Sequence, residues 1–225
     1  MTMKITRVSL PVRSASLWFD FFNQRLQLAE GRGDMSPSIQ LGSTRVEFRQ
    51  DDGQIGDHHL AFTIPEAKFG QAKRWIGERT TVLSRDGADE FECSPAWNAH
   101  SVYFEGPDGA VLELIARREL PPGQTGEFTS ASLLAVSEVG VAVSSVPESA
   151  SALATSAELH PYTESPDETF GAVGTTEGLL ILVVEGRTWF PTSDKIAAYG
   201  RIDIDATGHN PGRYLVGSST LTIRD

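Results

Sequence analysis

One order of elements recurs along this chain of 225 residues: a strand, a helix and then further short strands. The first segment begins with the strand pattern ITRVSLPV and continues with SASLWFDFFNQRLQL, where apolar residues recur at helical spacing and Ser14 is a suitable N-cap. The second repeats the order with DHHLAFTI, PEAKFGQAKRWIGER, HSVYFEG and AVLELIAR. Such units predict an α+β fold, because each sheet packs one face against its helix and needs a partner for the other.

A third segment opens with SEVGVAV and continues with VPESASALATSAEL and two more apolar runs. The stretch RELPPGQTGEFTSAS before it is rich in turn-forming residues and indicates a linker. We therefore expect one domain of two paired βαβββ units at residues 1–120, a linker at 121–132, and a third, degenerate unit at 133–225 with about two extra C-terminal strands. The first two units would enclose a cleft. The unpaired third unit favours a homodimer, unless the tail strands cover its open face.

The charge and composition narrow the functional classes. The net charge is −11, which argues against nucleic acid or an anionic membrane as a partner. Cys93 is the single cysteine, so no intrachain disulfide can form and nothing indicates secretion. The opening MTMKITRVSL alternates like a strand, and no apolar run approaches the length of about 20 residues that a membrane span needs. We expect a cytoplasmic protein.

Glu113 lies in the middle of an otherwise apolar strand, AVLELIAR. Side chains alternate along a strand, so Glu113 shares its face with Val111 and Ile115. A carboxylate on an apolar face needs a cation, a hydrogen-bond cluster, a metal or a substrate, and the pattern alone leaves open whether an arginine holds it. His59 shares its own strand face with the small Ala61, which leaves room above the sheet.

The repeated element order, the strand HLAFTIP and the closing GPDGAVLELIAR resemble the vicinal oxygen chelate superfamily. That superfamily includes glyoxalase I, bleomycin-resistance proteins and extradiol dioxygenases. WNAHSVYFEGPDG is also similar to a group of bacterial glyoxalase-like proteins. The resemblance covers residues 1–120 and is looser in the third unit. It implies a cleft between two paired units, with metal-ligand positions on the first and last strand of each unit.

Carried over to this sequence, the resemblance implies metal ligands at His59, Glu113 and Glu47. It places Arg7 at the fourth position, where metal-binding members carry histidine or glutamine. Two outcomes remain open. Either Arg7 pairs with Glu47 in place of a metal, or Arg7 binds an anionic substrate while the other three residues hold the ion.

The same positions in the third unit are Glu138 and Ile181, which argues against a second metal cleft. Tyr103 and Ser101 share a strand face that should line the cleft, and Trp97 lies in the loop before that strand. We assign these last three residues to substrate binding.

The resemblance implies a metal-dependent enzyme of lyase, isomerase or dioxygenase type that acts on a small oxygenated molecule. The divalent metal would be zinc, nickel, manganese or iron, and Glu113 or Glu47 would be the catalytic base. The alternative is a metal-free protein that binds and sequesters a small molecule, as in bleomycin resistance, and Arg7 favours it. Neither hypothesis involves nucleic acid or a membrane as a partner.

Overall fold

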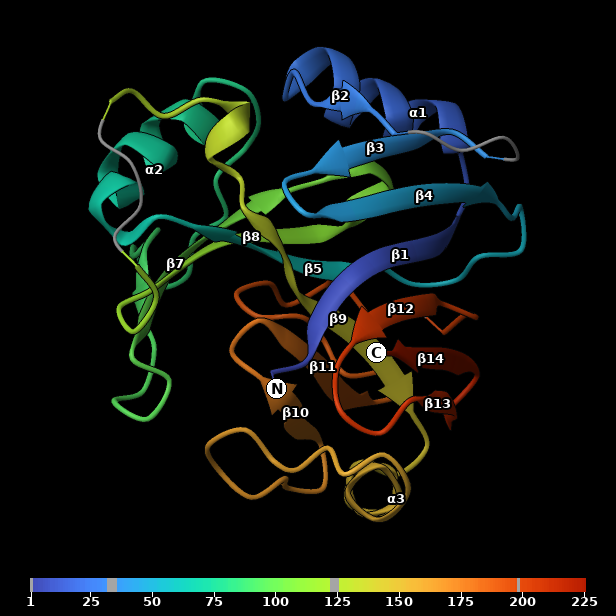
Figure 1. The fold of residues 1–225 in the computed structure, drawn as a ribbon. Coiled ribbons are helices and arrows are strands. Elements are labelled where there is room, and N and C mark those ends of the chain that lie inside the picture. The colour runs from blue at the N-terminus through green and yellow to red at the C-terminus, as the bar shows by residue number, and fades with distance from the viewer. Residues whose placement is uncertain (1, 32–35, 122–125, 198) are drawn as a thin grey trace.

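Two curved sheets of seven strands form the body of the protein in a computed structural model, which describes residues 2–31, 36–121, 126–197 and 199–225 (Figure 1). The first sheet has the strand order β13-β14-β12-β1-β4-β3-β2 and the second has the order β10-β11-β9-β5-β8-β7-β6. The strands of the first sheet are β1 (Lys4–Val12), β2 (Ala29–Glu30), β3 (Ser38–Leu41), β4 (Thr44–Gln50), β12 (Asp203–Thr207), β13 (Gly212–Val216) and β14 (Ser219–Arg224). Those of the second are β5 (His59–Ile64), β6 (Phe91–Glu92), β7 (Ala99–Glu105), β8 (Val111–Arg117), β9 (Ala135–Val143), β10 (Phe170–Thr175) and β11 (Gly178–Val184).

Three α-helices complete the fold: α1 (Ala15–Asp20), α2 (Phe69–Gly77) and α3 (Val146–Ser156). Ser14 caps α1 as predicted, because its hydroxyl accepts a hydrogen bond from the backbone nitrogen of Leu17 at 3.3 Å. Figure 1 shows α1 and α2 at one end of the molecule and α3 at the other. Within the described ranges, no helix has the length and apolar character needed to cross a lipid bilayer.

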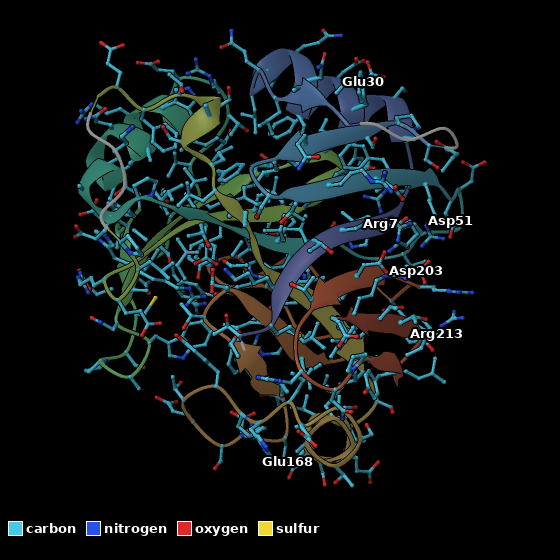
Figure 2. All side chains as sticks on the ribbon, viewed as in Figure 1. Arg7, Glu30, Asp51, Glu168, Asp203 and Arg213 are labelled. Atoms are coloured by element: carbon cyan, nitrogen blue, oxygen red, sulfur yellow. The ribbon has the colours of Figure 1, made fainter. Side chains whose placement is uncertain are left out.

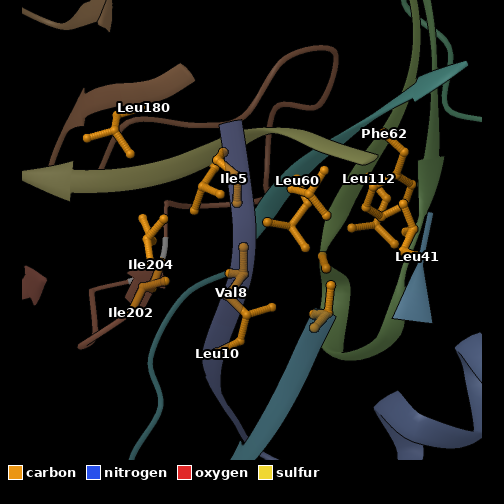
Figure 3. Close-up of a cluster of buried hydrophobic side chains, with 14 of the residues drawn as sticks. Ile5, Val8, Leu10, Leu41, Leu60, Phe62, Leu112, Leu180, Ile202 and Ile204 are labelled. Carbon is orange, nitrogen blue, oxygen red and sulfur yellow. The ribbon is translucent and has the colours of Figure 1, made fainter. Parts of the chain in front are cut away.

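The two sheets pack face to face through one hydrophobic core. Figure 3 shows Ile5 and Ile204 from the first sheet converging with Leu60 and Leu112 from the second. All four side chains are at most 1% exposed. Each strand alternates, so the opposite face of each sheet points away from this core and is available for polar or functional side chains.

The pairing of the units differs from the expected one. Strand β5 of the second unit pairs antiparallel with β9 of the third, and β1 of the first unit pairs antiparallel with β12 of the tail. The first and second units, within residues 1–120, therefore lie in different sheets, and the second unit is paired with the third. Periodicity predicts the strands and their apolar faces, but the free edge of β5 offers hydrogen-bonding groups that fit more than one partner strand.

The tail supplies β12, β13 and β14, one strand more than expected. Strand β9 pairs with both β5 and β11, so the strand edge that favoured a homodimer is filled within the chain. This removes that argument for a homodimer, whose formation stays an untested prediction. Residues 122–125 of the expected linker at 121–132 lie outside the described residues. Its later part is packed, with Phe128 buried against Trp75 at a ring-centroid distance of 5.3 Å.

The packing of the tail into the core is testable with two apolar residues of different tail strands. Ile204 of β12 is 1% exposed and Leu215 of β13 is 78% exposed. We expect Ile204→Ala to lower the free energy of unfolding by about 2–5 kcal/mol, because it leaves a cavity between the sheets. We expect Leu215→Ala to change it by about 0.5 kcal/mol or less. Urea unfolding measures both, and equal effects would contradict the placement of β12 in the core.

Candidate functional site

Three titratable side chains meet on the face of the second sheet that points away from the core: His59, Glu113 and Glu138. One ligating atom from each residue lies within 4.8 Å of the others, and all three residues are buried. The strand register explains the meeting, because Ala61 on the central strand β5 pairs with Glu113 on β8 at one side and with Glu138 on β9 at the other. Directly paired residues have Cβ atoms about 5 Å apart, so both carboxylates reach the space above the small Ala61 side chain.

His59 presents an unprotonated nitrogen to this cluster. Its Nδ1 lies 3.0 Å from the carbonyl oxygen of Val111, and a carbonyl only accepts, so Nδ1 carries the proton. Its Nε2 lies 3.6 Å from Oε2 of Glu113, beyond hydrogen-bonding distance. Burial lowers the pKa of His59 to about 4, and the charge of Arg187 acts in the same direction. The imidazole is therefore neutral at pH 7, as a metal ligand must be.

Glu113 is held by hydroxyl groups of the neighbouring strand. The hydroxyl of Ser101 donates to its Oε1 at 2.5 Å, and the side chain of Tyr103 also hydrogen-bonds the carboxylate. Burial, together with the nearby charge of Glu138, raises the pKa of Glu113 to about 8. Without a cation beside it, Glu113 carries a proton at neutral pH.

Glu138 is paired with Arg117, a fully buried guanidinium at the end of β8 whose Nη2 donates to Oε1 of the carboxylate. The guanidinium packs beside the rings of Trp97 and Tyr162, with its carbon 5.5 Å from each ring centroid. Burial raises the pKa of Glu138, and Arg117 opposes that shift. Arg117 keeps its proton at any ordinary pH, so its buried charge needs the carboxylate of Glu138 beside it.

The donor set fits a divalent cation. With Glu138 balanced by Arg117, the cluster holds one more carboxylate, which is neutralised either by a proton on Glu113 or by a cation. One imidazole nitrogen and two carboxylates are ordinary ligands for a first-row transition metal. The companion position of Glu138 in the third unit, on β11, holds Ile181, which cannot ligate. Three protein ligands leave coordination positions open, as in catalytic metal sites.

The cluster lies in a cavity of about 360 Å³, a volume suited to a small molecule. Its walls come from the second and third units and are largely aromatic and apolar. They comprise Cys93, Ser94, Trp97, Tyr103, Glu164, Phe170, Ile181, Arg187, Trp189 and Phe190, besides the three clustered residues. Trp189 stacks on the imidazole of His59 at 5.0 Å between ring centroids, which fixes the ring against the cavity wall.

Three residues assigned to substrate binding lie at or beside this cavity. Tyr103 and Trp97 line it, and Ser101 lies below the surface, where it bonds Glu113. Their positions follow from β7, which pairs antiparallel with β8 so that Tyr103 stands directly opposite Glu113. Their roles as substrate contacts stay predictions.

Arg7 and Glu47 lie in the other sheet, away from His59 and Glu113. Nε and Nη2 of Arg7 donate to Oε2 of Glu47 at 2.8 and 2.6 Å, and Nη1 lies 3.4 Å from Asp205. These carboxylates raise the pKa of Arg7. Figure 2 shows Arg7 on the open face of the first sheet. The assignment of Glu47 to the ligand set of His59 is wrong, because β4 and β5 belong to different sheets. Of the two outcomes for Arg7, the structure has the ion pair with Glu47.

Sequence reasoning missed Glu138, Arg117 and Arg187 as members of this site. Glu138 carried the same signal as Glu113, a carboxylate inside an apolar strand, and was set aside because Ile181 occupied the companion position. For Arg117 there was no such signal, since an arginine at the end of a strand is usually solvated.

The raised pKa of Glu113 predicts how the stability of the metal-free protein depends on pH. Folded Glu113 keeps its proton up to about pH 8, whereas the unfolded chain loses it near 4.5, so the free energy of unfolding falls as pH rises through this range. His58 and His59, with pKa values lowered to about 4, act in the opposite direction only below about 6.5. Urea unfolding in a chelating buffer should therefore show a loss of stability between pH 6.5 and 8.

Glu113→Gln, which cannot ionise, should reduce this loss. Glu47→Gln changes a carboxylate of the other sheet and should keep the wild-type dependence. Equal pH dependence in wild type and Glu113→Gln would show that Glu113 does not hold a proton in the folded protein.

Comparison with known proteins bears on the fold. No protein-family model and no curated protein matches the sequence. Among solved structures, glyoxalase I from Zea mays is similar with a TM-score of 0.59 at 11% identity, over 99% of this chain and 92% of that one. A V278E mutant of the maize enzyme matches with a TM-score of 0.58 at 14% identity, over 91% of this chain and 75% of that one.

A candidate dioxygenase from Bacillus subtilis is similar with a TM-score of 0.58 at 16% identity, over 99% of this chain and 84% of the other. These identities establish shared architecture, and they carry no assignment of reaction. The similarity spans nearly the whole chain and includes both sheets. The chain therefore has the glyoxalase-like α+β fold of these structures.

Proposed function

We propose that this protein is a divalent-metal-dependent enzyme that acts on a small oxygenated molecule. One observation carries the proposal: a neutral imidazole nitrogen of His59 and the carboxylates of Glu113 and Glu138 face one another, buried, beside a cavity of about 360 Å³. These three residues would hold the ion, with Glu138 in the place first assigned to Glu47. Burying a charged group costs several kcal/mol per ion, so these buried groups need a compensating interaction.

The mixture of nitrogen and oxygen donors suits zinc, nickel, manganese or ferrous iron. When bound, such an ion supplies Lewis-acid polarisation of a carbonyl or of neighbouring oxygens, and iron additionally supplies activation of dioxygen. These chemistries correspond to lyase, isomerase or dioxygenase reactions. The likeness to glyoxalase I and to a candidate dioxygenase is consistent with either group, through the fold alone.

The chain itself would supply proton transfer and a dry site. Glu113 would act as general acid or base, since its carboxyl group lies in the wall of the cavity that takes the bound molecule. Ser101 and Tyr103 keep its carboxyl group in a fixed orientation, since both hydroxyls bond to it. Trp189 and Phe190 form part of the wall that separates a bound molecule from water.

The metal is tested by elemental analysis of protein purified without a histidine tag or chelator. We expect about one divalent ion per chain in the wild type. Glu113→Gln and Glu138→Gln should lower metal affinity at least about tenfold, since an amide is a weaker ligand than a carboxylate. Glu47→Gln is the matched control and should retain the metal, because Glu47 is a partly buried strand glutamate of the other sheet.

Metal retained at wild-type stoichiometry in both Glu113→Gln and Glu138→Gln would refute the ligand set. A wild-type protein that takes up none of the four candidate ions after dialysis against each would refute metal dependence altogether.

A second function is favoured by the Arg117–Glu138 ion pair: metal-free binding or sequestration of a small molecule. The guanidinium already balances Glu138, and a proton balances Glu113, so the cluster is electrically complete without an ion. The aromatic cavity would then serve as a binding pocket for an unsaturated or apolar molecule.

This alternative predicts stabilisation by a ligand that does not depend on a metal. A compound that occupies the cavity should raise the melting temperature equally with and without a chelator, because it binds only the folded state. Thermal denaturation against a panel of aromatic metabolites and antibiotics measures this. Stabilisation abolished by the chelator would instead support the metal-dependent enzyme.

A further inference from the structure

Arg187 is the cation of the cavity wall that lacks a carboxylate partner. It follows β11, and its backbone is fixed at both sides: its N–H donates to the carbonyl of Val184 at 3.1 Å, and its carbonyl accepts from Ala197 at 2.9 Å. Its guanidinium carbon lies 5.2 Å from the centroid of the Phe170 ring. The side chain is therefore positioned by a rigid backbone and an aromatic surface.

The hydrogen-bonding capacity of this guanidinium is almost entirely unused. Nη1 donates to the carbonyl of Thr188 at 3.4 Å, a long contact. In the part of the chain that the structure describes, no ion pair joins Arg187 to a carboxylate. Asp167 accepts from the backbone nitrogens of Thr169 and Phe170, which lower its pKa, and the charge of Arg187 adds to this effect without an ion-pair contact. A guanidinium has five N–H donors in a planar fork that matches a carboxylate or phosphate.

The carboxylates that line the same cavity, in contrast, all have partners. Glu113 accepts from Ser101, Glu138 from Arg117, and Glu164 from the hydroxyl of Ser94 at 3.3 Å. Arg187, a partly exposed side chain, is therefore the cation that lines the cavity without an ion-pair partner. A bound anion would satisfy it with little competition from the protein.

Arg187 and the His59 cluster line the same cavity. Trp189, two residues after Arg187, stacks directly on His59. A molecule that fills the cavity can therefore contact both the guanidinium and the cluster. Phe170 and Trp189 also line the cavity and offer ring faces to an aromatic body.

We infer that the cavity takes an aromatic monoanion, with its carboxylate on Arg187 and an oxygen substituent at the opposite end facing His59, Glu113 and Glu138. The reactive end of this ligand rests on the proposed function, whereas the contact with Arg187 stands on the unpaired guanidinium. Arg187 thus takes the role of anion anchor that sequence reasoning assigned to Arg7.

The test compares carboxylates with their uncharged amides. Benzoate, 4-hydroxybenzoate and phenylacetate are titrated calorimetrically against the full chain beside benzamide, 4-hydroxybenzamide and phenylacetamide, with phenyl phosphate as the phosphate probe. We expect at least one carboxylate to bind about tenfold or more tightly than its amide. Arg187→Gln should remove that preference, and Arg187→Lys should retain part of it. Arg85→Gln, an exposed arginine near Phe190, is the matched control and should leave the preference unchanged.

Equal binding of each acid and its amide to the wild type, a preference that survives Arg187→Gln, or no measurable binding of any carboxylate would overturn the inference. Tighter binding of phenyl phosphate than of any carboxylate, lost in Arg187→Gln, would keep the anchor and replace carboxylate by phosphate. The same titrations on Glu113→Gln separate this inference from the proposed function: a preference that persists in protein without metal supports the Arg187 contact even if the metal site fails.

Discussion

The antiparallel pairing of β5 with β9 is the contact on which the candidate site depends. It places Ala61 between Glu113 and Glu138, so that two carboxylates stand on either side of the smallest side chain in the cluster. Neither β8 nor β9 could form the site alone, because each supplies one acid. The register matters as much as the pairing, since a slip by one residue would turn Glu138 into the core and Val139 into the cavity.

The two sheets carry similar side chains on equivalent strands and balance their charges differently. In the first sheet Arg7, Glu47 and Asp205 lie on β1, β4 and β12, and in the second His59, Glu113 and Glu138 lie on β5, β8 and β9. The guanidinium of Arg7 forms ion pairs with the carboxylates of both Glu47 and Asp205. The neutral imidazole of His59 brings no charge, so its cluster relies on Arg117, a proton or a cation. The carboxylates of the first sheet are therefore balanced by an arginine of the same cluster, whereas the cluster of the second sheet can still bind a cation.

Several features were predictable from local pattern. The strand containing His59, the strand containing Glu113 and the cap at Ser14 all agree with the structure, because alternation and capping depend on neighbours in the sequence. Glu113 was identified by the cost of burying a charge on an apolar face, an argument that needs only its own strand. The same argument applied to Glu138, and a wrong assumption about which units pair removed it from the ligand set.

The sequence by itself determined that the chain forms repeated βαβββ units, which faces are apolar, and that Glu113 requires a partner. Only the tertiary structure decided that β5 pairs with β9 and β1 with β12, and hence that Glu138 joins His59 while Glu47 joins Arg7. The physical reason is that a strand edge is chemically uniform: its N–H and C=O groups accept any strand of suitable register. The choice is made by the packing of whole units against one another, through side chains distant in sequence such as Ile5, Leu60 and Ile204.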